Sequence, residues 1–256
     1  DRVHLGTNTD PYQRAEGRYR LMPGILRALA AHGASIAILT KGTLLRRDLP
    51  LLAEIARDVP VSVAMSIAVF DDALQQSVEP GTPSTAARLA TVRAVRDAGL
   101  DCEVFLMPVL PGLTDTRAHL ERAYAAIAEA GATSAATTTL HLRPGAREWY
   151  LQWLEAQHPH LRDQYRRIYG GGSTACRDYR DWLIALFQAD HSLQVTRIRT
   201  NRDGSSTDVV VHAPSSSGRE AIDVTWWVAT AIGQPVWRAG VAPVALRLNS
   251  GGGIAT

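Results

Sequence analysis

Polar side chains that could hold a small ligand follow the apolar runs of this sequence, one group after another. They supply hydroxyl, amide, carboxylate, ammonium and guanidinium groups, a set that suits a zwitterionic ligand or one that carries a ribose. The residues concerned are Thr7, Asn8, Thr9, Asp10, Lys41, Ser66 and Arg143. Each of them taken singly is equally explained by a turn or a helix cap; Asp10 before Pro11, for example, is a common turn pair.

Lys41 is the only lysine of the chain, in which the other Lys/Arg positions are all arginine. In a sequence so biased toward arginine, a retained lysine can mark chemistry, either as a cation that binds an anion or as a Schiff-base or general-base amine. A surface lysine that survives by chance is the alternative. The sequence alone leaves these interpretations open.

The elements that must position these residues alternate regularly. Apolar or β-branched runs predict strands at 3–5, 35–39, 61–69, 102–107 and 135–141. Intervening segments predict helices at 19–32, 49–59, 82–99 and 116–130, with Thr82 as the N-cap of the third. Strands joined by helical crossovers run parallel, so their carboxyl ends share one edge, where (β/α) barrels place their active sites. We therefore expect an α/β fold, specifically a partial (β/α) barrel.

The pattern divides the chain into three parts. Residues 1–145 are expected to form the partial barrel core, and the aromatic-rich, helical residues 146–189 to pack on it. Residues 190–256 contain serine-rich and glycine-rich stretches and an uncapped apolar run around Trp226 and Trp227, which predicts an irregular tail. A frameshifted end and a genuine divergent extension both remain open for this tail.

The composition gives little support to several classes of function. A formal net charge of +2 exerts no strong pull toward nucleic acid or membranes. We expect no membrane partner and a cytoplasmic location, because the sequence has no signal peptide and no long apolar run. A nucleic-acid substrate stays open through a local basic patch of Arg14, Arg18, Arg20, Arg46 and Arg47. The sequence does not indicate an oligomeric state.

Three strings of residues are familiar. They are GTNTDPYQRAE at 6–16, ILTKG at 38–42 and LMPVLPGLTD at 106–115. In this order they resemble the radical SAM proteins related to spore photoproduct lyase, and the similarity extends from residue 1 to about 183. The first string is much more specific than the helix patterns.

The resemblance implies a fold, two cofactors and a reaction. The fold is a partial (β/α)6 barrel in which a CxxxCxxC loop holds a 4Fe-4S cluster. S-adenosylmethionine (SAM) chelates the cluster and is cleaved reductively to a 5′-deoxyadenosyl radical, which abstracts hydrogen from a substrate. By position, the resemblance places Thr7, Asn8, Thr9 and Asp10 around the methionine and ribose of SAM. Lys41 would contact its carboxylate or ribose, with Ser66 and Arg143 as further contacts.

The sequence departs from this family at the metal site. Three thiolates are needed to hold such a cluster, whereas this chain has two cysteines, Cys102 and Cys176, and no CxxxCxxC. We therefore expect no metal ligands in this chain, and a barrel that lacks its first strand and cluster loop. The preferred hypothesis is a radical SAM enzyme core with an unknown substrate, inactive as this fragment. The alternatives are an ordinary barrel enzyme that uses the Lys41 amine, and a non-catalytic truncated product.

Overall fold

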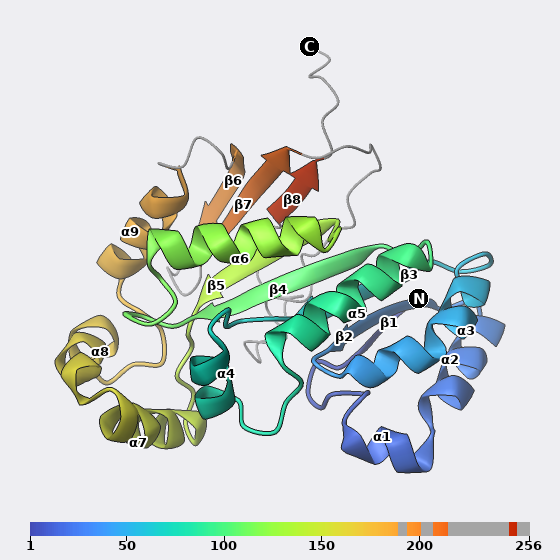
Figure 1. The fold of residues 1–256 in the computed structure, drawn as a ribbon, viewed down its shortest axis with the longest axis horizontal. Coiled ribbons are helices and arrows are strands. Elements are labelled where there is room, and N and C mark those ends of the chain that lie inside the picture. Colours follow the sequence, from blue (N-terminus) through green and yellow to red (C-terminus); the bar gives the residue numbers. More distant parts are fainter. Residues whose placement is uncertain (189–193, 201–206, 215–245, 250–256) are drawn as a thin grey trace.

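The computed structural model describes residues 1–188, 194–200, 207–214 and 246–249, and its centre is one mixed sheet (Figure 1). Within the described residues the sheet has the strand order β1-β2-β3-β4-β5-β8-β7-β6. The strands are β1 (Arg2–Leu5), β2 (Ser35–Thr40), β3 (Val61–Ser66), β4 (Cys102–Val109), β5 (Ser134–Thr139), β6 (Gln194–Thr200), β7 (Thr207–Pro214) and β8 (Leu246–Asn249).

Helices connect successive strands of the first half and follow β5 as a separate group. They are α1 (Arg14–Tyr19), α2 (Met22–Ala31), α3 (Leu49–Ile55), α4 (Asp72–Val78), α5 (Thr85–Asp97), α6 (Arg117–Glu129), α7 (Ala146–Gln157), α8 (Arg162–Tyr169) and α9 (Arg177–Gln188), with 3-10 turns η1 (Thr43–Asp48) and η2 (Pro159–Leu161). Among the described helices, none combines the length and apolar character needed to cross a membrane.

The first five strands are parallel neighbours, as the alternation predicts. β1 pairs with β2, β2 with β3, β3 with β4, and β4 with β5, all in parallel register. Each crossover passes through at least one helix, which is the usual connection between parallel strands. The expected α/β fold with a partial barrel of five strands is confirmed, and the carboxyl ends of these strands point to the same edge.

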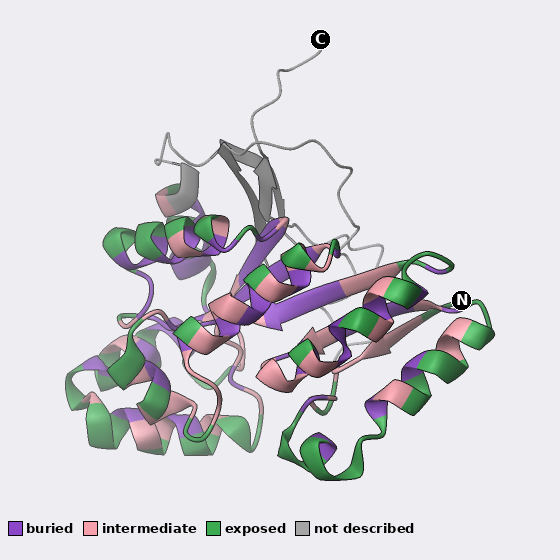
Figure 2. Ribbon diagram, turned by 45° about the vertical axis from the view of Figure 1, so that its right-hand side comes forward, coloured by how far each residue is buried: buried purple, intermediate pink, exposed green. Residues whose placement is uncertain are grey.

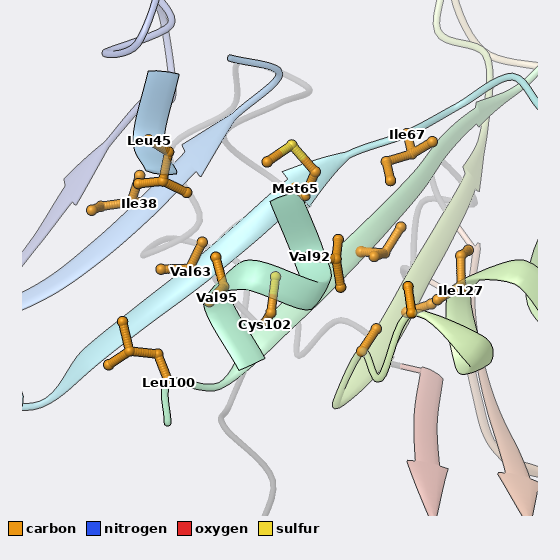
Figure 3. Packing of buried hydrophobic residues seen from close by; sticks show 14 of the residues in the cluster. Ile38, Leu45, Val63, Met65, Ile67, Val92, Val95, Leu100, Cys102 and Ile127 are labelled. Atoms are coloured by element: carbon orange, nitrogen blue, oxygen red, sulfur yellow. The ribbon is translucent and has the colours of Figure 1, made fainter. Parts of the chain in front are cut away.

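The main core lies between the sheet and the helices that cover one of its faces. Ile38, Val63 and Met65 project from β2 and β3 toward Val92 and Val95 of α5 (Figure 3). All five side chains are at most 2% exposed. Figure 2 shows that buried residues concentrate in the strands and exposed residues on the outer helix surfaces. This burial stabilises the crossovers, which place the carboxyl ends of the parallel strands at one edge of the sheet.

A second apolar cluster joins the helices after β5 to the edge of the barrel. Tyr150, Tyr165 and Tyr169 of α7 and α8 pack in this cluster with Val69 and Leu110 from the loops after β3 and β4. The Tyr150 and Tyr165 hydroxyls lie 2.8 Å apart, and Tyr169 donates to the Leu140 carbonyl at 2.7 Å. The aromatic residues of this region therefore form packing contacts, as their helical spacing indicates.

The predicted helix at 19–32 begins later than expected, because α2 starts at Met22 and a separate short helix, α1, ends at Tyr19. Arg20 adopts a left-handed φ of 51° and ends α1. The Glu16 carboxylate then accepts hydrogen bonds from the backbone N–H groups of Leu21 (2.9 Å) and Met22 (3.1 Å) where α2 begins. Since the first turn of a helix has unpaired N–H groups, this carboxylate caps α2 from the preceding helix. Local periodicity carries no signal for such a cap.

The third predicted helix begins later than expected, and its preceding strand ends earlier. The N-cap of α5 is Ser84, whose hydroxyl accepts from the Ala87 N–H at 3.2 Å, and not Thr82. The Thr82 hydroxyl instead donates to the Glu79 carbonyl at 2.8 Å. β3 ends at Ser66 rather than at residue 69.

The residues after 190 differ from the expected irregular tail where the structure describes them. β8 pairs antiparallel with β5, β7 pairs parallel with β8, and β6 pairs antiparallel with β7. These three strands extend the sheet beyond its parallel part. Trp226 and Trp227, on which the expectation of an irregular tail partly depends, lie outside the described residues.

Candidate functional site

The carboxylate of Asp10 ties the loop after β1 to the end of β2. Its Oδ1 accepts hydrogen bonds from the Tyr12 N–H (2.8 Å) and the Thr40 hydroxyl (2.5 Å), and its Oδ2 accepts from the Lys41 N–H (2.7 Å). The Thr40 Oγ1 in turn accepts from the Gly42 N–H at 2.8 Å. Asp10 therefore connects the loop after β1 to the end of β2 through its hydrogen bonds.

Two glycines allow these loops to approach so closely. A Cβ on Gly42 would lie 2.3 Å from the Tyr12 carbonyl oxygen, and a Cβ on Gly6 would lie 1.9 Å from that of Leu39. Gly6 also has a φ of +103°, which other residues rarely adopt. The backbone of the site therefore requires glycine at both positions.

A cavity of about 820 Å³ opens at this edge of the sheet. Its lining comes from the loop after β1 (Asp10 and 12–14), the loop after β2 (41–44) and residues 81–83 between α4 and α5. The volume falls within the range of about 300–1,000 Å³ that is typical of small-molecule sites. The predicted edge of the sheet therefore carries a cavity of suitable size for a nucleoside-like ligand.

The structure brings some predicted site residues to this cavity and leaves others outside its lining. Asp10 and Lys41 line it. Thr7 is half-buried and Asn8 and Thr9 are exposed in the loop after β1, while Ser66 ends β3 and Arg143 lies half-buried between β5 and α7. The expectation that Asp10, Lys41 and Ser66 gather at one edge of the sheet is confirmed by the parallel registers.

The ammonium of Lys41 forms an ion pair with the carboxylate of Glu79, from the loop after α4. The other Glu79 oxygen accepts from the Arg88 guanidinium at 2.7 Å. Burial by itself raises the pKa of Glu79, but the charges of Lys41 and Arg88 outweigh it and hold that pKa below its ordinary value. Glu79 is therefore a carboxylate shared between two cations.

Arg88 fastens the wall of the cavity to the sheet. Its side chain is fully buried on α5 and donates to the carbonyls of Pro83 (2.8 Å) and Ser66 (3.0 Å) and to the Thr82 hydroxyl (2.6 Å). The sequence prediction missed both Arg88 and Glu79. One signal existed: Arg88 stands four and seven residues before the buried Val92 and Val95, on the core-facing side of its helix.

The arginines expected to form a basic patch are partly engaged elsewhere. Arg47 pairs with the Glu16 carboxylate at 2.6 Å and with Asp48 at 2.7 Å. Arg14 lines the cavity and donates to the Gly81 carbonyl at 3.1 Å. Arg14 thus adds a second cation to the cavity beside Lys41.

The cysteines do not form a metal centre. Cys102 is fully buried at the start of β4, at the opposite edge of the sheet from the cavity, and burial raises the pKa of its thiol. Cys176 is exposed. Within the described residues, no group of three or more metal-binding side chains comes together. Two separated thiols do not fit a cluster that needs three.

Curated relatives match part of this chain. An uncharacterized protein of Mycobacterium tuberculosis is 58% identical over 181 residues, which cover 71% of this chain and 53% of that protein. An uncharacterized protein of Methanocaldococcus jannaschii is 26% identical over 114 residues, which cover 44% of this chain and 42% of that protein. The chain spans about half the length of the curated relatives it matches.

Solved structures and a family model complete the comparison. TYW1 with a lysine-pyruvate adduct bound aligns at a TM-score of 0.48 and 11% identity over 82% of this chain and 56% of that chain. A spore photoproduct lyase mutant aligns at 0.45 and 13% over 81% of this chain and 52% of that chain. Residues 1–124 match the model of the radical SAM superfamily, and this segment contains the whole lining of the cavity. By that match, residues 1–124 of this chain are similar to the radical SAM superfamily.

Proposed function

We propose that the cavity between the ends of β1 and β2 binds SAM, and that the chain is the cofactor-binding core of a radical SAM enzyme. The observation that carries this proposal is the position of Lys41. The single lysine of the chain lines a cavity at the carboxyl edge of the parallel strands, within the segment that matches the superfamily.

The lining of the cavity fits the chemical groups of SAM. The ammonium of Lys41 and the guanidinium of Arg14 are donors suited to a carboxylate. Thr43 adds a hydroxyl that can bind a ribose, and Asp10 has lone pairs beyond the three donors from which it already accepts. Thr7, Asn8, Thr9, Ser66 and Arg143 stay proposed as further contacts on the strength of the resemblance alone.

The reaction belongs to the proposal for the longer protein. When bound beside a reduced cluster, SAM supplies a 5′-deoxyadenosyl radical, and hydrogen abstraction from an as yet unknown substrate is the activity we propose. The residues of this chain do not account for the electron transfer, because its two cysteines do not fit the cluster. The 256 residues alone should bind SAM without cleaving it.

The test is equilibrium dialysis of the purified chain with radiolabelled SAM. Lys41→Ala should weaken binding about 5- to 150-fold, the equivalent of the ~1–3 kcal/mol of a charge-assisted hydrogen bond. Arg93→Ala is the matched control, because its ion pair with Glu129 at 3.8 Å is exposed and distant from the lining. No measurable binding by the unaltered chain, or equal binding by Lys41→Ala, would remove the basis of the proposal.

A second experiment tests the cluster. After anaerobic reconstitution, the chain should retain no stoichiometric iron and sulfide and release no 5′-deoxyadenosine with dithionite. A version extended at Asp1 with a CxxxCxxC segment should retain iron and sulfide and should release 5′-deoxyadenosine with dithionite. A cluster on the short chain would contradict the argument from two cysteines, and an inert extended chain would contradict the proposed reaction.

The alternative use of Lys41 as a Schiff-base amine has less support. Such a lysine reacts as the neutral amine and is usually activated in an apolar pocket or beside another cation. Here the Lys41 side chain forms an ion pair with the Glu79 carboxylate, which is unlike either of these surroundings. Borohydride trapping of an aldehyde on Lys41 would favour this alternative over SAM binding.

A further inference from the structure

We propose that Glu79 and Arg88 are positioning residues, which hold the Lys41 ammonium in place at the cavity while leaving it cationic toward an anionic group of the ligand. This proposal rests on the proposed function of the same cavity. It adds two residues that neither the sequence motifs nor the predicted site residues include.

The first step of the argument is a charge count. One Glu79 oxygen accepts from Lys41 and the other accepts from Arg88 at 2.7 Å. Two cations therefore share one anion, and the group of three carries a surplus charge of +1. An isolated Lys41–Glu79 pair would be neutral and would attract an anion only weakly. Because Arg88 neutralises Glu79, the lysine can be held without losing its attraction for a carboxylate.

The second step locates that surplus charge. The side chain of Arg88 is 1% exposed and that of Glu79 is 14% exposed, whereas that of Lys41 is 41% exposed and lines the cavity. Neither Glu79 nor Arg88 is among the residues that line the cavity. The member that faces the cavity is the lysine, so the unbalanced charge is presented there.

The third step concerns rigidity. Arg88 donates to Pro83, Ser66 and Thr82 in addition to Glu79, so the loop at 79–83 is fastened to the end of β3. A free lysine loses much of its side-chain entropy when a ligand immobilises it. A lysine already bound to an immobile carboxylate has lost part of that entropy before binding, which favours the complex.

A competing interpretation makes the opposite prediction. If Glu79 simply occupied Lys41 and blocked it, removal of the carboxylate would strengthen the binding of an anionic group. Blocking is not expected, because Arg88 already neutralises Glu79 and leaves the charge of Lys41 unbalanced. Arg14, whose guanidinium donates to the Gly81 carbonyl at 3.1 Å, is a second cation at the cavity. The sign of the effect of Glu79→Gln therefore separates positioning from blocking.

The experiment uses the fact that Lys41 is the only lysine. The purified chain is treated with an amine-acylating ester, and acylation of Lys41 is followed by peptide mass spectrometry with and without SAM. SAM binding is measured in parallel by dialysis. The variants are Glu79→Gln, Glu79→Asp and Arg88→Lys. The matched control is Asp101→Asn, the same change in the Arg96–Asp101 pair (2.7 Å) at the opposite end of α5.

Glu79→Gln should acylate faster at Lys41 without ligand. It should bind SAM about tenfold more weakly, because the freed lysine then loses its side-chain entropy on binding. Glu79→Asp should restore part of both properties, which a merely structural defect would not show. Asp101→Asn should match the unaltered chain. Arg88→Lys, which keeps the charge but loses the planar fork, should change acylation in the same direction as Glu79→Gln.

Other outcomes decide against the proposal or against its premise. Tighter SAM binding by Glu79→Gln, or unchanged acylation and binding, overturns the positioning role. If Glu79→Gln does not fold, Glu79→Asp and Arg88→Lys decide in its place, and unchanged Lys41 acylation in both overturns the proposal. If the unaltered chain binds no SAM while Glu79→Gln still changes Lys41 acylation, the proposed ligand is wrong and the control of Lys41 by Glu79 stands.

Discussion

Substitution of Asp10 by asparagine tests whether the site depends on one carboxylate. Asp10 accepts two hydrogen bonds on Oδ1 and one on Oδ2, from Tyr12, Thr40 and Lys41. An asparagine amide can keep its oxygen in the position of Oδ1. Its NH2 group then faces the Lys41 backbone N–H, which lies 2.7 Å from Oδ2 in the structure, so two donors oppose each other.

The cost follows from the contacts that are lost. The hydrogen bond from the Lys41 N–H is lost, and that half-buried donor is left without an acceptor. The bonds from Tyr12 and Thr40 remain but no longer have a charged acceptor. Together these losses lower the free energy of unfolding by about 2–3 kcal/mol. In a chain of this size each kcal/mol lowers the melting temperature by about 2–4 °C. Asp10→Asn should therefore melt about 4–12 °C lower, as measured by circular dichroism or scanning calorimetry.

The control is Asp101→Asn, in which the same chemical change affects an ion pair that is 27% exposed on both sides. Such pairs contribute about 0–1 kcal/mol, so the control should melt within about 4 °C of the unaltered chain. Equal melting temperatures for Asp10→Asn and the unaltered chain would refute the view that this carboxylate organises the two loops.

Three further results are expected from the geometry. Gly42→Ala should cost about 1–3 kcal/mol in urea denaturation, because its Cβ would lie 2.3 Å from the Tyr12 carbonyl oxygen; an unchanged midpoint would show that the loops can separate. Ile38 is 0% exposed in the core of Figure 3, and Ile38→Ala should lower the free energy of unfolding by about 2–5 kcal/mol in the same assay. A smaller loss would mean that neighbouring side chains fill the space left by the shortened side chain. Burial first, and Arg2 second, lower the pKa of His4 from 6.5 to about 4, so the neutral ring is favoured in the fold. That contribution is complete above pH 6.5 and is lost as the pH falls toward 4; His4→Asn should flatten this part of a stability–pH curve, and an unchanged curve would contradict the assignment.

The sequence alone was sufficient for the arrangement of the barrel core. β-branched and apolar runs alternate with amphipathic segments, and this local pattern determines that strands are joined by helical crossovers and run parallel. The same reasoning placed Asp10 and Lys41 at one edge of the sheet, where the structure has its cavity. The motifs at 6–16, 38–42 and 106–115 also indicated the superfamily whose model matches residues 1–124.

Only the tertiary structure showed what each polar side chain of the site does. Asp10, singled out as a ligand contact, uses its carboxylate on the backbone of a strand end about 30 residues away. Glu16 caps a helix that begins six residues later, although nothing in the helical pattern marks it. Lys41 is held by Glu79, which is held by the buried Arg88. Hydrophobic periodicity specifies which face of an element is buried, but a polar pairing depends on where two distant segments meet, and only the packed sheet decides that.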